Sequence, residues 1–369
     1  MENNDKKNIL VCPLNWGKGH ATRVQVIAGE LVRRGYKVYI AAPHKYNKTF
    51  DRSAYTELVN IWSPSIYYSG FFPLFIDVFF QLPVHFIAFI TDRLRLAGIL
   101  RRYSIGLIIS DNRFGFWSKR VYSIYITHQL RVALPRAFSF AGSFISSIHR
   151  FIVSRYDECW VPDLPGEDNL SGRLSHHCSQ PSYTYYIGPL SRLFYHTPRW
   201  RGSPDPCRNG HAPFTLALLS GPEPQRSIFE KIIISQKSIF PGQLIIVAGR
   251  PEDDNQIADS DILRYPWLDS SSLSVLVMKA ELIICRSGYS TIMDLCLAGS
   301  SALFIPTPGQ PEQEYLAHYL ADKYGCTIIK QKDLAHITEL PAVKKEIKWP
   351  AAGRDMLDTV LNDAFKRIP

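Results

Sequence analysis

Residues 283–299 read IICRSGYSTIMDLCLAG, a short apolar run that passes through Arg-Ser-Gly into a second apolar segment ending at glycine. The pattern predicts a buried strand, a tight turn and a helix over residues 290–298. A helix N-terminus carries unpaired N–H groups and the positive end of the helix dipole. We expect this turn to bind an anionic group, although an ordinary serine-capped helix also fits these residues.

The side chains around this turn suit a phosphorylated sugar ligand. Gly288 lets the backbone approach a ligand closely. The hydroxyls of Ser287, Ser290 and Thr291 can cap the helix or donate to phosphate oxygens. Asp294 lies within the first turns of the expected helix, where its carboxylate can reach sugar hydroxyls.

A second turn of this kind lies in residues 218–226, LLSGPEPQR. A strand ends there, Ser220 and Gly221 form the turn, and a helix begins near Pro224. The spacing again predicts a helix N-terminus at the end of a strand, which favours phosphate binding.

A third glycine-rich turn leads from the first strand into a helix, in residues 14–23, LNWGKGHATR. Gly17 and Gly19 shape the loop, and His20 stands at the helix N-terminus. The helix dipole disfavours a charged ring there, so His20 should stay neutral and able to accept a proton. Thr22 occupies the third glycine's place of the dinucleotide fingerprint GxGxxG, so the motif is a different one.

Strand-like and helix-like segments alternate along the chain, which is typical of an α/β fold with parallel sheets. A stretch rich in proline, glycine and charge, residues 196–213, interrupts the alternation as a linker would. We therefore expect two Rossmann-like domains with a ligand site in the cleft between them. The expected boundaries are 1–197 for an N-terminal acceptor-binding domain with an aromatic insertion at 66–102, 198–212 for the linker, 213–350 for a C-terminal nucleotide-sugar domain, and 351–369 for a final helix that packs back on the first domain. The expected strands are 9–14, 37–42, 107–111, 124–128, 158–162, 185–189, 214–219, 244–248, 282–285 and 302–306, and the expected helices are 21–34, 225–236, 290–298 and 311–324.

Within the insertion, residues 71–90 (FFPLFIDVFFQLPVHFIAFI) are about as long as a membrane span. Asp77, Gln81 and His85 recur every four residues and would give a helix one polar face, and two prolines also oppose a simple span. A buried helix and an interfacial helix that meets an anionic membrane surface both remain open. The arginines that would meet lipid in the second interpretation are Arg93, Arg95, Arg101 and Arg102.

The chain has 369 residues, 46% of them hydrophobic, and a formal net charge of +9. The size suits two globular domains, and the charge suits a phosphorylated substrate or an anionic membrane. No nucleic-acid-binding motif accompanies the charge, so we expect no nucleic-acid partner. The first ten residues lack the apolar stretch of a signal peptide, and the seven cysteines include no CxxC pair. We expect a reduced, cytoplasmic protein, peripheral on the inner face of the membrane if the insertion meets lipid.

Polar side chains end two strands of the first domain. The sequence ISDNRFG puts Asp111, Asn112 and Arg113 at one strand end, and THQL puts His128 at the next. Asp111 could orient His20 or bind an acceptor hydroxyl, and the other three are candidates for acceptor binding. The structural alternatives are a turn-forming Asp111 and a core histidine at His128.

Two groups of potential metal ligands have spacings that match no familiar metal site. DSD at residues 259–261 lies in an acidic loop with no apolar strand before it. His176, Cys178, Cys207 and His211 fit no established zinc pattern. We expect neither a metal nor another cofactor.

Residues 280–320, AELIICRSGYSTIMDLCLAGSSALFIPTPGQPEQEYLAHYL, resemble the donor domain of glycosyltransferase family 28. GKGH at residues 17–20 and THQL at residues 127–130 resemble the same family more loosely. The resemblance implies an α/β fold of the GT-B type, with two Rossmann-like domains facing each other across a cleft. It also implies a reaction that usually needs no metal.

The resemblance further implies roles for individual residues. Arg286, Ser287 and Gly288 match a turn beside the nucleotide diphosphate. Asp294 stands where the family has a glutamate that holds the ribose, and the shorter side chain leaves less reach.

The same resemblance implies which residues would contact the uracil base and the donor sugar. Backbone groups of Trp267 and Leu268 would contact uracil, and Gln313 matches a glutamine that contacts the donor sugar. Glu314 replaces a second glutamine of the family, which leaves the identity of the sugar open. The full set of expected donor-binding residues is Gly17, Gly19, Ser220, Gly221, Trp267, Leu268, Arg286, Ser287, Gly288, Ser290, Thr291, Asp294, Gln310 and Gln313.

Together these residues predict an inverting, metal-independent glycosyltransferase that moves a hexose or N-acetylhexosamine from a UDP-sugar to a hydroxyl acceptor, for which a lipid-linked glycan precursor is one candidate. His20 and Asp111 are the expected catalytic residues, and Arg286 with the helix N-termini would stabilise the departing diphosphate. A nucleotide-sugar hydrolase of the same fold, with water as the acceptor, is one alternative. A catalytically silent nucleotide-sugar-binding subunit is another.

Overall fold

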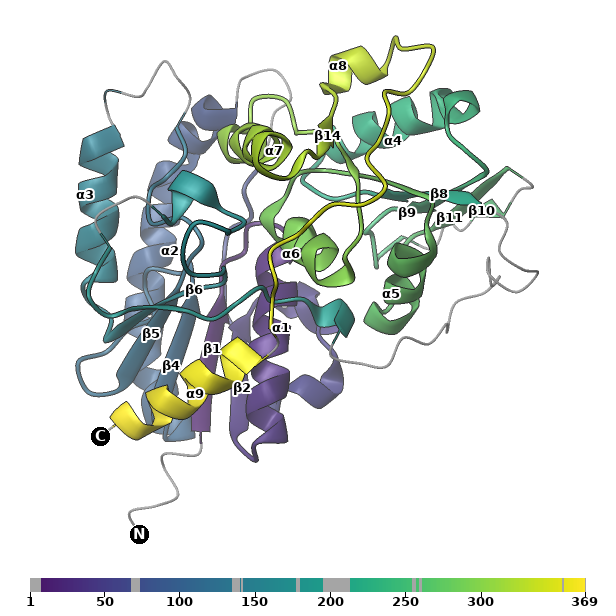
Figure 1. The fold of residues 1–369 in the computed structure, drawn as a ribbon. Coiled ribbons are helices and arrows are strands. Elements are labelled where there is room, and N and C mark those ends of the chain that lie inside the picture. Colours follow the sequence, from purple (N-terminus) through teal and green to yellow (C-terminus); the bar gives the residue numbers. More distant parts are fainter. Residues whose placement is uncertain are drawn as a thin grey trace. The chain divides into compact units, whose positions relative to one another are not determined.

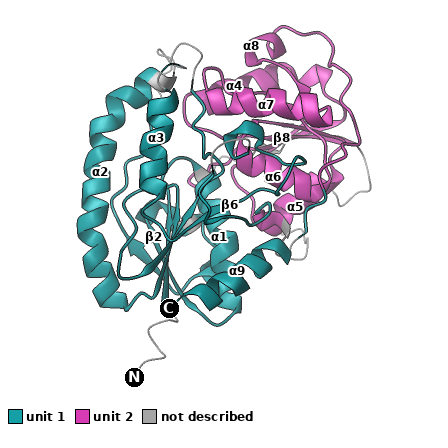
Figure 2. Cartoon of the chain, turned by 60° about the vertical axis from the view of Figure 1, so that its left-hand side comes forward, with its two compact units in different colours: residues 1–66, 76–190, 351–369 teal, residues 67–75, 191–350 magenta. Residues whose placement is uncertain are grey.

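The computed structural model describes residues 8–67, 74–134, 140, 142–176, 180–194, 213–253, 257–258, 261–353 and 355–368. The chain divides into two compact units (Figure 2). Unit 1 comprises Met1–Ile66, Ile76–Leu190 and Ala351–Pro369, and unit 2 comprises Tyr67–Phe75 and Ser191–Pro350. The expected linker, residues 198–212, lies outside the described residues.

The described strands of unit 1 form one seven-stranded parallel sheet with the order β3-β2-β1-β4-β5-β6-β7 (Figure 1). Apolar residues fill these strands, and β4 and β6 are buried along their whole length, as expected for a sheet covered on both faces. The strand order reverses beside β1, which pairs with β2 on one side and β4 on the other. The strands are β1 (Asn8–Pro13), β2 (Lys37–Ala42), β3 (Glu57–Asn60), β4 (Leu107–Asp111), β5 (Tyr122–Ile126), β6 (Glu158–Val161) and β7 (Thr184–Tyr186).

Helices cover this sheet and close its core. α1 packs against β1 and β2. The C-terminal half of α2 contributes Leu96 and Ile99 to a buried cluster with Leu10, Ile108 and Phe116. The described helices of unit 1 are α1 (Lys18–Arg33), α2 (Leu74–Tyr103), α3 (Gly142–Val153) and α9 (Asp355–Arg367).

Unit 2 repeats the plan, with the strand order β10-β11-β9-β8-β12-β13-β14. The order reverses beside β8, which pairs in parallel with β9 and with β12. Only the short β10 runs antiparallel among the described strands of this sheet. The strands are β8 (Phe214–Leu218), β9 (Gln243–Val247), β10 (Ile257–Ala258), β11 (Ile262–Tyr265), β12 (Leu282–Cys285), β13 (Leu303–Phe304) and β14 (Thr327–Ile328).

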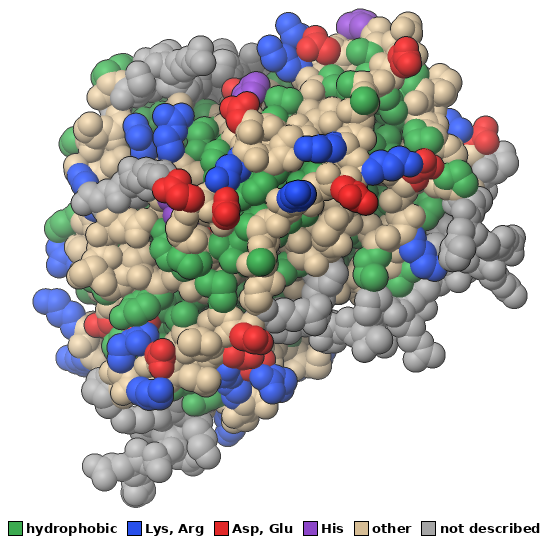
Figure 3. All heavy atoms as spheres, in the orientation of Figure 1, with side chains coloured by type: hydrophobic (Ala, Val, Ile, Leu, Met, Phe, Trp, Pro, Cys, Tyr) green, Lys and Arg blue, Asp and Glu red, His purple; other side chains and the backbone are tan. Residues whose placement is uncertain are grey.

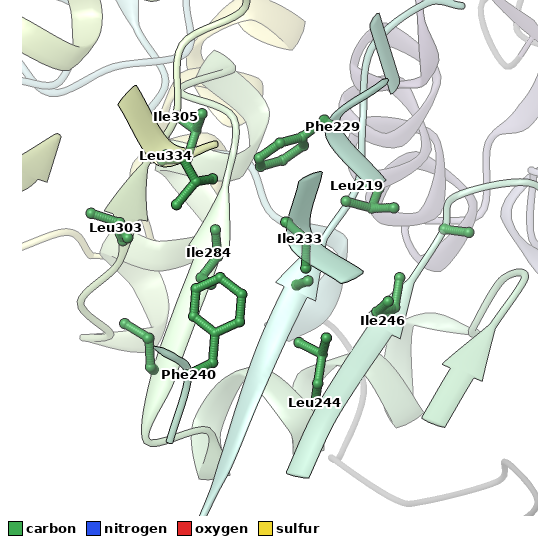
Figure 4. Packing of buried hydrophobic residues seen from close by; sticks show 13 residues of the cluster. Leu219, Phe229, Ile233, Phe240, Leu244, Ile246, Ile284, Leu303, Ile305 and Leu334 are labelled. Carbon is green, nitrogen blue, oxygen red and sulfur yellow. The ribbon is translucent and has the colours of Figure 1, made fainter. Parts of the chain in front are cut away.

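The core of unit 2 lies between its sheet and α4 (Figure 4). Phe229 and Ile233 on α4 pack with Leu244 and Ile284 on the strands, and Leu334 on α8 joins them. Burial of each such side chain contributes about 1.5–3 kcal/mol. The described helices of unit 2 are α4 (Gln225–Ser235), α5 (Ser270–Lys279), α6 (Tyr289–Ala298), α7 (Pro311–Tyr324) and α8 (Gln331–Leu334).

Strand β13 is shorter than the expected 302–306. The Ile305 N–H still bonds the Cys285 carbonyl, but the carbonyls of Ile305 and Pro306 accept hydrogen bonds from the Arg286 side chain. A buried side chain therefore takes the acceptors that a neighbouring strand would otherwise use.

In its described part the aromatic insertion is a long helix with an exposed apolar face between residues 79 and 90, so the buried-helix interpretation is wrong for that face. α2 runs through Pro83 and exposes Phe80 by 72% and Phe86 by 63%. Asp77 is buried instead, which reverses the usual distribution of polar and apolar side chains. None of the described helices combines the length and hydropathy needed to cross a membrane. The exposed apolar side chains of α2 are Phe79, Phe80, Leu82, Val84, Phe86, Ile87, Ile90 and Leu94.

The charges on the surface are mixed. On the face drawn in Figure 3, described lysine and arginine side chains lie among aspartates and glutamates rather than in one broad basic patch. This face lacks the basic stripe typical of nucleic-acid-binding proteins.

The C-terminal helix α9 belongs to unit 1. Phe365 stacks on Tyr36 with ring centroids 4.6 Å apart. Arg367 donates a 2.7 Å hydrogen bond from Nε to the buried Glu158 and lies over the Tyr185 ring. Glu158 also accepts hydrogen bonds from Tyr122 and Trp160, so a buried carboxylate fixes the end of this helix.

Replacing Arg367 should therefore destabilise unit 1. Arg367→Ala leaves the Glu158 carboxylate buried without its cationic partner, and we expect a loss of about 1–3 kcal/mol in the free energy of unfolding. Lys366→Ala is the matched control, because the Lys366–Asp363 pair is exposed and should contribute less than about 1 kcal/mol. Urea denaturation of the two variants would measure this, and equal midpoints would contradict the role of Arg367.

Candidate functional site

The reversal of strand order brings two loops of unit 1 together. β1 and β4 are adjacent and parallel, so the loops that follow them leave the same edge of the sheet. The Leu14 N–H bonds the Asp111 carbonyl at 2.9 Å, which joins the two loop starts directly.

The loop after β1 is held by side chains from elsewhere in unit 1. Asn15 donates to the Ser63 carbonyl at 2.7 Å and accepts from the Tyr46 hydroxyl at 2.8 Å. Gly17 has a φ of 76°, a conformation that favours glycine, and forms the N-cap of α1. These contacts fix the point at which α1 begins, and His20 is its third residue.

His20 and Asp111 are in contact, as the sequence analysis suggested. His20 Nδ1 lies 3.0 Å from Asp111 Oδ2 and the His20 side chain is 13% exposed, so its edge stays reachable. Arg23 was not foreseen. It is buried, donates to both oxygens of Asp111 at 3.2 and 2.6 Å, and has Nη2 2.8 Å from His20 Nδ1.

The carboxylate at the centre of this cluster is ionised. Burial alone would raise the pKa of Asp111, but the Arg23 charge and the hydrogen bonds from His20 and Arg23 outweigh burial and lower that pKa to about 2. Arg23 follows His20 by three residues, which places both side chains on one face of α1. That spacing is the sequence signal by which Arg23 could have been found.

The expected acceptor-binding residues divide in the structure. Asn112, with a φ of 53°, accepts a 3.0 Å hydrogen bond from the Tyr125 hydroxyl, and its side chain is half-buried. His128 is buried at the end of β5. Arg113 is buried too and donates to both carboxylate oxygens of Asp92 at 2.7 Å. The Arg113 charge therefore serves the fold, and we remove this residue from the acceptor site.

Arg286 needs a similar correction. Its guanidinium is fully buried and stacks 4.0 Å from the centre of the Phe229 ring. It donates to the Ile305 carbonyl at 3.0 Å, to the Gln225 carbonyl at 3.1 Å and to Gln331 Oε1 at 2.6 Å. Burial lowers the pKa of Arg286 to about 9. Arg286 therefore ties together the loops at the carboxyl edge of the sheet and does not present its charge to a ligand.

Ser287 and Gln313 also act within the fold. The Ser287 hydroxyl donates to the Gln313 carbonyl at 2.8 Å, and Gln313 Oε1 accepts from the Thr307 N–H at 2.9 Å. Glu314 accepts from the Gly309 N–H at 3.1 Å. Gln310, at the N-cap of α7, has a buried Oε1 without a hydrogen-bond partner in the described part of the chain. Gln310 thus differs from Gln313, whose side-chain oxygen is used within the fold.

The N-terminus of α6 is open. Gly288 is its N-cap with a φ of −74°, no side chain caps the helix, and a Cβ added at Gly288 would meet no atom within 4 Å. Ser290 and Thr291 lie in the first turn and are half-buried. A helix end of this kind, with space before it, suits an anion.

The loop after β8 is also open at Gly221, whose φ is 98° and around which a Cβ would meet no atom within 4 Å. Ser220 beside it is exposed. Glu223 lies in the same loop, where Arg226 and Arg250 donate to it at about 3 Å. Burial alone would raise the pKa of Glu223, but hydrogen bonds from Ser227 and Arg226 outweigh burial and lower that pKa to about 2.

Asp294 is already engaged by the chain itself. Its Oδ1 accepts a short hydrogen bond from the Ser191 hydroxyl, and Arg192 acts on it electrostatically. Burial raises the pKa of Asp294 to about 6, and these two neighbours offset only part of that rise. Both lie about a hundred residues earlier in the chain, so no local pattern indicated them.

Trp267 and Leu268, the residues expected to contact the uracil base, follow β11. Leu268 is buried, Trp267 is half-buried, and Asp269 caps α5 by accepting from the N–H groups of Ser271 and Ser272. Among the described residues no group of three or more His, Cys, Asp or Glu could hold a metal ion. The DSD and His/Cys groups of the sequence analysis lie partly outside those residues. Five cysteines, Cys12, Cys159, Cys285, Cys296 and Cys326, are buried free thiols.

Comparison with known proteins identifies part of the chain. Residues 236–352 match the glycosyltransferase family 28 C-terminal domain. A UDP-N-acetylglucosamine–N-acetylmuramyl-(pentapeptide) pyrophosphoryl-undecaprenol N-acetylglucosamine transferase of Pasteurella multocida is 45% identical over 56 residues, which cover 15% of this chain and 16% of that protein. The enzyme of the same name from Actinobacillus pleuropneumoniae is 44% identical over 91 residues, 24% of this chain and 25% of that protein. The chain thus spans a quarter or less of the length of these curated relatives.

Solved structures resemble the chain over most of its length. The glycotransferase of kitacinnamycin superposes with a TM-score of 0.60 and 16% identity, covering 90% of this chain and 88% of that one. The glycosyltransferase SnogD from Streptomyces nogalater gives a TM-score of 0.57 with 13% identity over 98% and 94% of the two chains. At such identities the likeness concerns the fold. The chain therefore has the two-domain GT-B fold, and its residues 236–352 are similar to the glycosyltransferase family 28 C-terminal domain.

Proposed function

We propose that the protein is an inverting, metal-independent glycosyltransferase that transfers a hexose or N-acetylhexosamine from a UDP-sugar to a hydroxyl acceptor. The observation that carries the proposal is the family 28 domain, which includes the open N-terminus of α6. Relatives that are similar to a quarter or less of this chain are named for transfer of N-acetylglucosamine from UDP-N-acetylglucosamine. The first donor to test is therefore UDP-N-acetylglucosamine.

Unit 2 would bind the donor. The open helix end at Gly288 and the loop at Gly221 offer backbone N–H groups to the diphosphate. Asp294 would accept a ribose hydroxyl, with Arg192 nearby as a counter-charge. Arg286 would contribute indirectly by holding these loops in place. Preorganised N–H groups of this kind can stabilise the charge of the leaving diphosphate without a metal.

Unit 1 would supply the base. With the Nδ1 proton of His20 donated to Asp111, the Nε2 lone pair is free to remove the acceptor hydroxyl proton. The acceptor oxygen then forms its bond to the anomeric carbon as the bond from that carbon to the diphosphate breaks. A single displacement of this kind inverts the configuration at the anomeric carbon.

A membrane surface is the proposed location of the acceptor. Two guanidinium groups lie close to the Trp117 ring of unit 1: Cζ of Arg93 on α2 is 4.1 Å from the ring centre, and Cζ of Arg155, just after α3, is 5.9 Å from it. α2 and α3 run side by side in Figures 1 and 2, and both expose aromatic residues. Aromatic and basic side chains on one surface suit the interface of an anionic bilayer. The exposed apolar side chains at α3 are Phe140, Phe144, Ile148 and Phe151, and the exposed arginines of the two helices and their ends are Arg95, Arg101, Arg102, Arg150 and Arg155.

UDP should bind in the presence of EDTA, and Gly288→Val should abolish that binding. The valine fits the φ of −74° and its Cβ would meet no atom within 4 Å, so the fold should be kept while the side chain fills the space before α6. Calorimetry measures binding, and a thermal melt of the variant checks its folding. Binding that appears only with Mg²⁺ or Mn²⁺ would contradict the metal-free mechanism.

His20→Ala should lower the turnover number by about 10²–10⁴-fold, because general-base catalysis contributes that much. UDP affinity should change little, since the base does not hold the nucleotide. The assay measures UDP release from UDP-N-acetylglucosamine with the muramyl-pentapeptide lipid of the relatives' names as the first acceptor. His44→Ala is the control, an exposed histidine of the same unit. Turnover within about threefold of the wild type would exclude His20 as the base.

The protein should sediment with vesicles that contain anionic lipid, and high salt should weaken the association. Phe80→Glu combined with Phe86→Glu puts two charges on the apolar face of α2 and should abolish it. Met278→Glu is the control, since Met278 is also an exposed apolar residue, at 56%, but belongs to unit 2. Sedimentation that all variants share would show that this face of α2 does not meet lipid.

A further inference from the structure

Arg23 is the one member of the His20 cluster to which the proposed mechanism gives no role. It is 2% exposed, and it reaches both partners of the proton transfer. We propose that Arg23 is a positioning residue that keeps the His20 ring unprotonated at rest and fixes the Asp111 carboxylate that orients the ring. This proposal rests on the proposed function for its consequence in catalysis, but its electrostatic part can be tested without any substrate.

Hydrogen bonding at His20 Nδ1 gives the first argument. Nδ1 lies 2.8 Å from an Arg23 nitrogen that always carries hydrogen and 3.0 Å from a carboxylate oxygen that can only accept. In a neutral ring either partner can be satisfied, through one tautomer or the other. The neutral tautomer with its hydrogen on Nε2 can accept from Arg23, whereas a protonated ring always carries hydrogen on Nδ1 and can pair there only with Asp111. Arg23 thus stabilises a neutral form of the ring through a contact that the protonated ring cannot make.

Charge gives the second argument. With a neutral His20, the Asp111 carboxylate and the Arg23 guanidinium sum to zero. Protonation of His20 would raise the sum to +1 at a largely buried site. Without Arg23, the same protonation would neutralise a buried carboxylate and would be strongly favoured. Arg23 thus removes the attraction that Asp111 alone would exert on a proton at His20.

The other groups that face the cluster do not change this balance. Tyr125 on β5 lies near Asp111 and Arg23, and burial raises its pKa well above the ordinary value. Tyr46 donates to the Gly17 carbonyl at the start of α1, and burial raises its pKa to about 12. Both phenols remain neutral in the range where histidine titrates. The Asp92–Arg113 pair, also in unit 1, balances its own charges.

The test follows the His20 ring by NMR in protein with labelled histidine, its signal being assigned as the one that His20→Ala removes. In Arg23→Met, which keeps the bulk of the side chain and removes the charge, we expect the midpoint of the His20 titration to rise by about one pH unit or more, a tenfold change in proton affinity. Arg23→Lys should return the midpoint toward the wild type. Arg34→Met is the control, because Arg34 is an ion-paired arginine at the C-cap of the same helix that contacts Glu30 and Asp358 instead.

Asp111→Asn tests the same balance in the opposite direction and covers the case in which Arg23→Met fails to fold. The His20 ring would then face Arg23 alone, and its midpoint should fall below the wild-type value. A merely structural role for Arg23 predicts loss of stability with the midpoint unchanged. An unchanged midpoint in Arg23→Met, or in Asp111→Asn where Arg23→Met is unfolded, overturns the proposal.

Kinetics then tests the consequence for catalysis. In Arg23→Met the acidic limb of the pH profile of kcat/KM should move upward with the NMR midpoint, while UDP affinity in unit 2 stays near that of the wild type. A shifted midpoint with an unshifted limb would contradict the positioning role. Absence of transfer in the wild-type protein would instead contradict the proposed function and leave the titration result intact, so the two failures are distinguishable.

Discussion

The order of the strands is the constraint on which both candidate sites depend. In each sheet the order reverses beside its first strand, at β1 and β4 in unit 1 and at β8 and β12 in unit 2. Loops that leave neighbouring strands at such a point diverge to opposite sides of the sheet and leave a crevice between them. His20 and Asp111 follow the first pair of strands, and Gly221 and Gly288 follow the second. The candidate site residues thus lie at the points where the topology leaves backbone groups uncovered.

Two arginines show how much charge the protein uses to hold these loops. Arg286 satisfies carbonyls of the loop after β13 and of Gln225, the first residue of α4, and Arg113 pairs with Asp92 of α2. A buried guanidinium needs most of its donors satisfied, so it fixes several chain segments at once. Loss of either arginine would leave buried acceptors unpaired. The loops can therefore present open helix ends without side-chain caps, because the buried arginines fix the conformation of the loops.

Much of the fold could be predicted from the sequence, because hydrophobic periodicity, glycine turns and strand–helix alternation are local signals. β2, β4, β12 and α7 match the expected bounds, and the other expected elements differ by a few residues at their ends. β3, α3, α5 and β11 were not predicted, since short apolar segments do not reveal their partners. The contacts Arg23–Asp111 and Ser191–Asp294 join residues 88 and 103 positions apart. Such pairs form only when the sheet has folded. The sequence pattern therefore indicated the turns but not the side-chain contacts made there. The exposed face of α2 could not be predicted either, because the sequence of this helix is apolar on nearly every side.

The Ser191–Asp294 hydrogen bond bears on how a donor would be recognised. The carboxylate already accepts a hydroxyl group, so a ribose hydroxyl that replaced Ser191 would exchange one hydroxyl donor for another. Exchange of equivalent hydrogen bonds changes the free energy little, whereas an empty carboxylate would gain the whole contact. Asp294 would then serve to reject ligands that displace Ser191 without offering a hydroxyl, because the half-buried carboxylate would lose its partner. Affinity for the donor would come mainly from the diphosphate at the open helix ends, and selectivity for a ribose from Asp294.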